Sequence, residues 1–214
     1  MRSHFDQQLE LLNRNLMEMG ALCEEAIVLA ARAMTDGGSE AGRITDVDER
    51  IDKMERSIES LCLRLLLRQQ PEEQDLRVVS AALKMITDME RIGDQAADIA
   101  ELLPFLEGRS SDSRLRLREM GQAASRMVGA AVDAYVQRDA EGARDVQEMD
   151  DVVDQYFRDI KADLLGLITE DPTQGEYAMD LLMIAKYFER IGDHATNIAE
   201  WAVFSVTGEK ENLE

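Results

Sequence analysis

Apolar residues recur along most of the chain at alternating steps of three and four, the spacing of a helix that buries one stripe of its surface. The first stripe runs from Phe5 to Ile27, and the glycines Gly37 and Gly38 after it favour a helix stop. A later stripe covers residues 85–103. These stripes and the breakers between them predict six helices, over roughly residues 3–35, 41–69, 75–106, 113–138 and 141–168 and, last, a helix that includes 184–202.

One segment of the chain occurs twice. Residues 89–101 (MERIGDQAADIAE) return as residues 188–200 (FERIGDHATNIAE), at a constant offset of 99. A Met-Gly pair and a proline also repeat at an offset of 101, namely Met19-Gly20 with Met120-Gly121 and Pro71 with Pro172. Between the halves, residues 108–113 are small and polar, as in a linker. We therefore predict an all-α protein of two tandem three-helix bundles related by internal duplication, 1–107 and 114–214.

Each copy of the repeated segment has a strip of oxygen-bearing side chains. Glu90, Asp94 and Asp98 step by four residues, so they share one helix face, roughly opposite the apolar stripe. Acids on such a face are usually only solvated. Here Lys and Arg do not alternate with them, so the carboxylates repel one another unless a cation binds. The second copy has the corresponding strip Glu189, Asp193 and Asn197.

The hairpins bring these strips level with acids on the preceding helix. Helices joined by a short turn run antiparallel, so residues equally far from the turn lie side by side. Asp48 and Asp94 both lie 23 residues from Pro71, and the second such pair, Asp52 and Glu90, both lie 19 residues from it. Oxygen-rich clusters of this kind suit hard or borderline cations such as Mg²⁺, Mn²⁺, Ca²⁺ and iron. The second hairpin pairs acids in the same way to within one residue: Asp150 with Asp193, and Asp154 with Glu189.

The balance of charge restricts the partners. With 44 acidic and 24 basic residues, the net charge of −20 argues against binding to nucleic acid or directly to an anionic membrane. Divalent cations and basic protein surfaces are the natural partners. The N-terminal residues are polar, no apolar run approaches about eighteen residues, and Cys23 and Cys62 lack CxxC spacing. We expect a cytoplasmic protein with reduced core cysteines, which reaches a membrane only through partners.

The E-R-I-G-D signature at 90–94 and 189–193, the paired acidic segments and the Met-Gly pairs together resemble the PhoU family, over nearly the whole chain. The resemblance implies two three-helix bundles, often dimeric, with metal ions or multinuclear metal clusters on the acidic motifs of some members. It also implies a cytoplasmic regulator of phosphate homeostasis, which restrains phosphate uptake and phosphate-starvation signalling through a Pst-type transporter ATPase and its sensor histidine kinase. Carried onto this sequence, the motifs that would bind the metal (Mg, Mn, Fe, Zn or Ca) fall on Asp48, Asp52, Glu90, Asp94, Asp150, Asp154, Glu189 and Asp193. Asp98 and Asn197 extend the same strips, and we expect them to belong to the sites.

The two acidic sites are unequal. The first has Asp98 where the second has the neutral Asn197, and it has Glu55 and, on the first helix, Glu24 within reach. Lys186 stands one turn from the second site, where it competes for the carboxylates. We therefore expect the first site to bind a cation more tightly.

Three alternatives compete with a metal-binding regulator. A carboxylate-bridged metal oxidase uses Glu-x-x-His pairs, but the chain has two histidines, and Glu189 to His194 is a step of five. No glycine-rich phosphate loop or paired nucleophile and base is evident, so we expect a non-enzyme that binds phosphate only weakly without metal. The other two alternatives are a metal-free helical scaffold whose acids meet a basic partner, and an accessory protein of another phosphate transporter.

Overall fold

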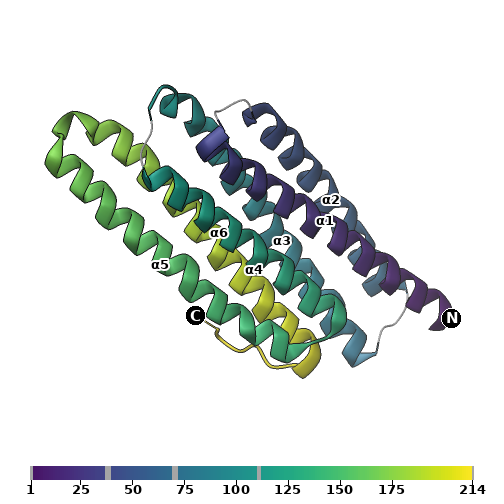
Figure 1. Ribbon diagram of the computed structural model, residues 1–214. Helices are drawn as coiled ribbons and strands as arrows, with labels where there is room; N and C mark the ends of the chain where they lie inside the picture. Colours follow the sequence, from purple (N-terminus) through teal and green to yellow (C-terminus); the bar gives the residue numbers. More distant parts are fainter. Residues whose placement is uncertain (1, 37–39, 69–71, 110–111, 214) are drawn as a thin grey trace.

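The computed structural model describes residues 2–36, 40–68, 72–109 and 112–213. Within these ranges the chain is all-helical, which confirms the predicted fold class. The predicted stop at Gly37 and Gly38, and Pro71 of the first hairpin, lie outside the described residues. None of the described helices combines the length and apolar character needed to span a membrane. The elements are α1 (Arg2–Asp36), α2 (Ala41–Arg68), α3 (Glu73–Leu102), η1 (Leu103–Leu106), α4 (Asp112–Gln137), α5 (Ala140–Glu170), η2 (Pro172–Gln174) and α6 (Gly175–Thr207) (Figure 1).

The third helix differs from its predicted span at both ends. It stops at Leu102 because Pro104 follows, and a proline ring at this position would clash with a backbone carbonyl four residues earlier. The chain continues as the short 3-10 turn η1 instead. At the start, the helix begins at Glu73 and not at Asp75, which lies three residues after the cap residue Glu72. The Asp75 carboxylate accepts a hydrogen bond from the backbone N–H of Glu72 at 3.3 Å.

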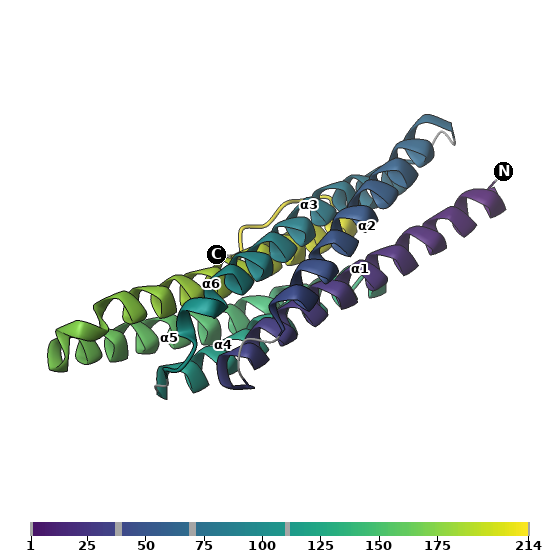
Figure 2. The ribbon, with the colours of Figure 1, turned by 90° about the horizontal axis from the view of Figure 1, so that it is seen from above.

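The described helices form two layers. In one layer α2, α3, α6 and α5 lie side by side in that order, and in the other α1 and α4 pack across them (Figures 1 and 2). Successive helices run antiparallel, so α3 and α6 are antiparallel neighbours from different halves of the chain, as are α1 and α4. The apolar stripes meet in one continuous core, which includes Leu16, Ile51, Met89 and Phe188. The two predicted three-helix units share this core, and their limits, 1–107 and 114–214, stay a prediction.

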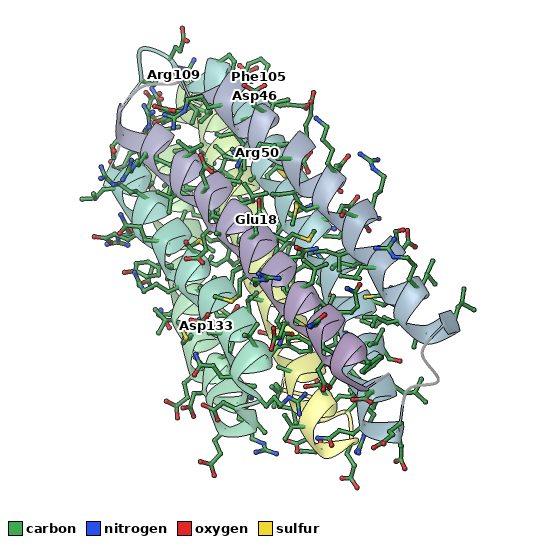
Figure 3. All side chains as sticks on the ribbon, turned by 90° about the vertical axis from the view of Figure 1, so that its right-hand side faces the viewer. Glu18, Asp46, Arg50, Phe105, Arg109 and Asp133 are labelled. Atoms are coloured by element: carbon green, nitrogen blue, oxygen red, sulfur yellow. The ribbon has the colours of Figure 1, made fainter. Side chains whose placement is uncertain are left out.

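Polar contacts also tie the helices together across the layers. The buried Tyr135 of α4 donates from its hydroxyl to the carbonyl oxygen of Val78 in α3 at 2.8 Å. Burial raises the pKa of this hydroxyl, so it stays protonated and remains a donor. Arg50 of α2 pairs with Glu25 of α1 at 3.5 Å. Figure 3 looks onto α1, which lies between α4 and α2, with Arg50 labelled on α2.

The two cysteines are buried free thiols, as predicted. The thiol of Cys23 donates to the backbone carbonyl of Met89 at 3.4 Å and so contributes to the contact between α1 and α3. Burial raises the pKa of both thiols, that of Cys62 to about 12. Both therefore stay protonated and act as small apolar side chains in the core.

The repeated Met-Gly pair marks places where helices approach closely. A Cβ atom on Gly121 of α4 would lie 2.8 Å from the Cβ atom of Ala31 in α1 and 2.8 Å from the ring of Phe188 in α6. A Cβ atom on Gly20 of α1 would lie 3.2 Å from Val132 of α4. Glycine is therefore required at position 121 to let three helices, from both halves, pack at one point.

We expect the substitution Gly121→Ala to destabilise the protein and Gly166→Ala to stabilise it. Both changes gain roughly 0.5–1 kcal/mol of helix propensity. At Gly121 an overpacking cost of about 1–3 kcal/mol outweighs that gain, whereas Gly166 of α5 has open space around it. Urea unfolding of the two variants measures this directly. Shifts of the same sign in both would contradict the close approach at Gly121.

Candidate functional site

The first acidic site depends on a close contact between α2 and α3. A Cβ atom on Gly93, the glycine of the first E-R-I-G-D signature, would lie only 2.6 Å from the Oδ1 atom of Asp48 and 3.1 Å from Ile51. No other residue type fits there without moving the carboxylate. The hairpin therefore places Asp48 level with Gly93 and Asp94, as the count from the turn predicts.

Asp48 is a half-buried carboxylate that forms no ion pair with a basic side chain among the described residues. Burial, followed by repulsion from nearby carboxylates that include Asp52 and Asp94, raises its pKa from the ordinary 3.8 to about 6. Its Oδ1 atom is buried and has no hydrogen-bond partner among the described residues. An orphaned carboxylate oxygen costs free energy, which a proton, a donor or a cation would relieve.

Basic side chains partly neutralise the other acids of this site. Arg91 pairs with Glu90 at 3.5 Å and with Asp94 at 3.0 Å, and Arg56 pairs with Asp52 at 3.7 Å. The expectation that these acids lack basic partners was therefore wrong. It failed because the long side chain of Arg91, next to Glu90 in the sequence, reaches along the helix surface to Asp94. Burial and then nearby acids still raise the pKa values of two more carboxylates, those of Glu90 and Asp98.

The second site repeats the arrangement between α5 and α6. A Cβ atom on Gly192 would lie 3.1 Å from the Oδ1 atom of Asp150. Burial, followed by repulsion from Asp154 and Asp193, raises the pKa of Asp150 to about 6. Here too basic residues intervene: Arg158 pairs with Asp154 at 3.3 Å, and Lys186 pairs with Glu189 as expected. Lys186 also lies 5.7 Å from the centre of the Phe157 ring.

Two predicted contributors point away from the acidic sites. The Asn197 amide donates to Asp88 of α3 at 3.2 Å, and Nδ1 of His194 lies 2.9 Å from the same Asp88 oxygen atom. Glu24, considered for the first site, packs against the position of Gly129 on α4. Asp88 was missed from the sequence because its partners lie on a helix of the other half, where no short turn fixes the register.

The acids of each site interact, but they do not form a ready metal cage. Within the described ranges, no three His, Cys, Asp or Glu side chains are placed to hold one ion together. Asp48 nevertheless interacts with Asp52, Asp94 and Asp98, and Glu90 interacts with Asp52. Side-chain rotations that release Arg91 or Lys186 would be needed to bring the oxygen atoms to a common cation.

The fold and sites define a class of protein: a duplicated six-helix bundle in which each hairpin packs a carboxylate against a signature glycine. The model of the PhoU domain matches residues 16–103 and 117–202, and the chain belongs to the PhoU family. It is 35% identical over 207 residues to the phosphate-specific transport system accessory protein PhoU homolog of Pseudomonas aeruginosa, covering 95% of this chain and 86% of that protein. The corresponding homolog of Clostridium acetobutylicum is 34% identical over 215 residues, covering 99% and 98%.

Solved structures agree with this assignment. The crystal structure of PhoU from Pseudomonas aeruginosa superposes with a TM-score of 0.90 at 34% identity, covering 96% of this chain and 100% of that one. The phosphate transport system regulatory protein PhoU from Streptococcus pneumoniae superposes with a TM-score of 0.87 at 28% identity, covering 97% and 99%. The whole described fold, including both acidic hairpins, therefore belongs to the family architecture.

The raised pKa of Asp48 predicts a pH-dependent effect of Asp48→Asn on the metal-free protein. Between about pH 4 and pH 6 the folded state binds more protons than the unfolded state, so stability falls as pH rises, and the penalty is complete above pH 6. Asparagine stays uncharged. We therefore expect the variant to be more stable than the parent by about 1 kcal/mol at pH 7, allowing for solvent screening, and not at pH 4.

Chemical unfolding at the two pH values in the presence of a chelator checks this expectation. Asp46→Asn is the matched control, because Asp46 lies on the same helix and is exposed. A gain that is equal at both pH values, or equal in the control, would show that Asp48 is not held under electrostatic strain.

Proposed function

We propose that this protein is a regulator of phosphate homeostasis that negatively modulates phosphate uptake and phosphate-starvation signalling. The proposal is supported by family membership and by relatives along nearly the whole chain that are named as phosphate-specific transport system accessory proteins. By the family resemblance, its partners are the Pst-type transporter ATPase and the associated sensor histidine kinase, and it forms a homodimer. We further propose that it is cytoplasmic and is not an enzyme.

We also propose that metal ions bind on the duplicated acidic motifs. The observation that supports this most directly is the buried, unpartnered Oδ1 atom of Asp48, held against Gly93 within reach of other carboxylates. Asp150 repeats the arrangement against Gly192. Carboxylate oxygen donors fit Mg²⁺, Mn²⁺, Ca²⁺ or iron, and also admit zinc. A bound cation would supply the positive charge that Arg91 and Lys186 supply in its absence.

A metal-free scaffold is the second candidate. It is favoured by the basic side chains that already neutralise part of each site, and by the lack of a preformed three-ligand group among the described residues. In that case the acidic faces would bind a basic surface of a partner. Measuring bound metal separates the two candidates.

The metal proposal predicts unequal sites. The first site keeps Asp98, whereas in the second the corresponding Asn197 is engaged by Asp88 and Lys186 competes for Glu189. Asp52→Ala with Glu90→Ala should therefore remove more metal than Asp154→Ala with Glu189→Ala, measured by elemental analysis of protein purified with metal present. Because binding stabilises the folded state, the first double variant should also lose more of the rise in Tm that metal produces.

A third double variant controls for the loss of negative charge. Glu170→Ala with Glu176→Ala removes two exposed acids near the turn between α5 and α6 and should leave bound metal unchanged. Equal loss of metal from all three variants, or no metal in the parent, would rule out specific binding on the acidic motifs.

The regulatory proposal predicts a phenotype in the native host. Deleting the gene should raise expression of phosphate-starvation genes in phosphate-rich medium and deregulate phosphate uptake, because the restraint on the transporter and its sensor kinase is lost. Reporter expression and uptake of labelled phosphate measure both effects, with restoration by the intact gene as the control. A deletion strain with unchanged expression and uptake would refute the assignment.

A further inference from the structure

A groove between α3 and α6 brings the two copies of the signature together. It has a volume of about 600 Å³ and lies on the seam where the two halves of the chain run antiparallel. Arg91 and Arg190 line it, and they are the equivalent arginines of the two E-R-I-G-D signatures. Gln95 and His194 are also equivalent to each other. The full lining is Arg91, Asp94, Gln95, Ala97, Asp98, Arg190 and His194.

The arginines give this groove donors that the fold does not use up. No hydrogen bond or ion pair within the described ranges engages the exposed guanidinium of Arg190. Arg91 pairs with the partly exposed Glu90 and Asp94 and also attracts Glu55, and the charge of Arg190 attracts Asp98. Guanidinium groups present several N–H donors in a plane, which matches the oxygen atoms of a phosphate group.

The groove also contains an acceptor that lacks a partner. Gln95 is only 7% exposed, and its Oε1 atom has no hydrogen-bond partner among the described residues. A buried amide oxygen without a donor costs free energy, so a ligand that donates a hydrogen bond to it, once the amide has turned toward the groove, would be favoured. Asp98 supplies a second acceptor in the same lining.

We propose that this groove binds inorganic phosphate in a protonated form. The two arginines would donate to its oxygen atoms, and the remaining P–O–H group would donate to Gln95 or Asp98. Sulfate has the same shape but no proton at neutral pH, so it would leave these acceptors unsatisfied. The net charge of −20 and the acids beside Arg91 limit the affinity to the millimolar range, in keeping with the weak binding expected from the sequence.

This site goes beyond the proposed function and requires no metal. It is tested by titrating phosphate into the metal-free full chain, at constant ionic strength, while the ³¹P linewidth and the arginine Nε–H signals are followed. We expect saturable broadening and shifts of the Arg91 and Arg190 signals. Arg190→Gln and Arg91→Gln should each weaken binding about tenfold, the effect of losing one charge-assisted contact. Sulfate should compete poorly.

Arg126→Gln is the matched control, because Arg126 is exposed on α4 and the change in net charge is the same. This variant should bind phosphate like the parent, and circular dichroism checks that all variants fold. Absence of saturable binding, an equal loss in Arg126→Gln, or signal shifts confined to other arginines would overturn the proposal. Equal competition by sulfate would also overturn it. None of these results depends on whether the acidic motifs bind metal or whether the host phenotype appears.

Discussion

The contact between a carboxylate on one helix and a glycine on the next is the constraint on which both hairpins depend. Asp48 lies so close to α3 that a side chain at position 93 would displace its carboxylate, and Asp150 approaches Gly192 similarly but less closely. Close packing removes each carboxylate from water, and neighbouring acids repel it, so the pKa of both rises to about 6. The fold therefore holds two carboxylates, those of Asp48 and Asp150, in surroundings that favour binding of a proton or a cation.

Duplication explains why the two halves share one core and yet differ at their acidic sites. The antiparallel seams between α3 and α6 and between α1 and α4 bury apolar stripes from both halves. Between α3 and α6, Asp88 accepts a hydrogen bond from Asn197 and contacts the ring nitrogen of His194. Asn197, at the end of the second acidic strip, therefore contributes to the contact between the two halves. The first strip keeps Asp98 instead, with its pKa raised chiefly by burial.

The helices and the pairing within each hairpin could be predicted because their physical rules are local. The spacing of apolar residues fixes which face of a helix is buried. A short turn fixes which residues of the two helices it joins, such as Asp48 and Asp94, lie side by side. The rest depends on contacts between distant segments. Arg91 reaches the acids beside it, Glu24 packs against α4, and Asn197 meets Asp88, and no turn or periodicity specifies these contacts. For the same reason the sequence did not predict that Arg91 and Arg190, which lie on helices of different halves, line one groove.

We propose that a cation relieves the electrostatic strain of the carboxylates held against the signature glycines. The most direct measurement is the unfolding free energy of the chain with and without saturating Mn²⁺, from pH 7 down to pH 4. The account predicts a clear stabilisation at pH 7 that disappears as Asp48 and Asp150 protonate around pH 6 and below. No stabilisation at pH 7, or one that is independent of pH, would contradict it.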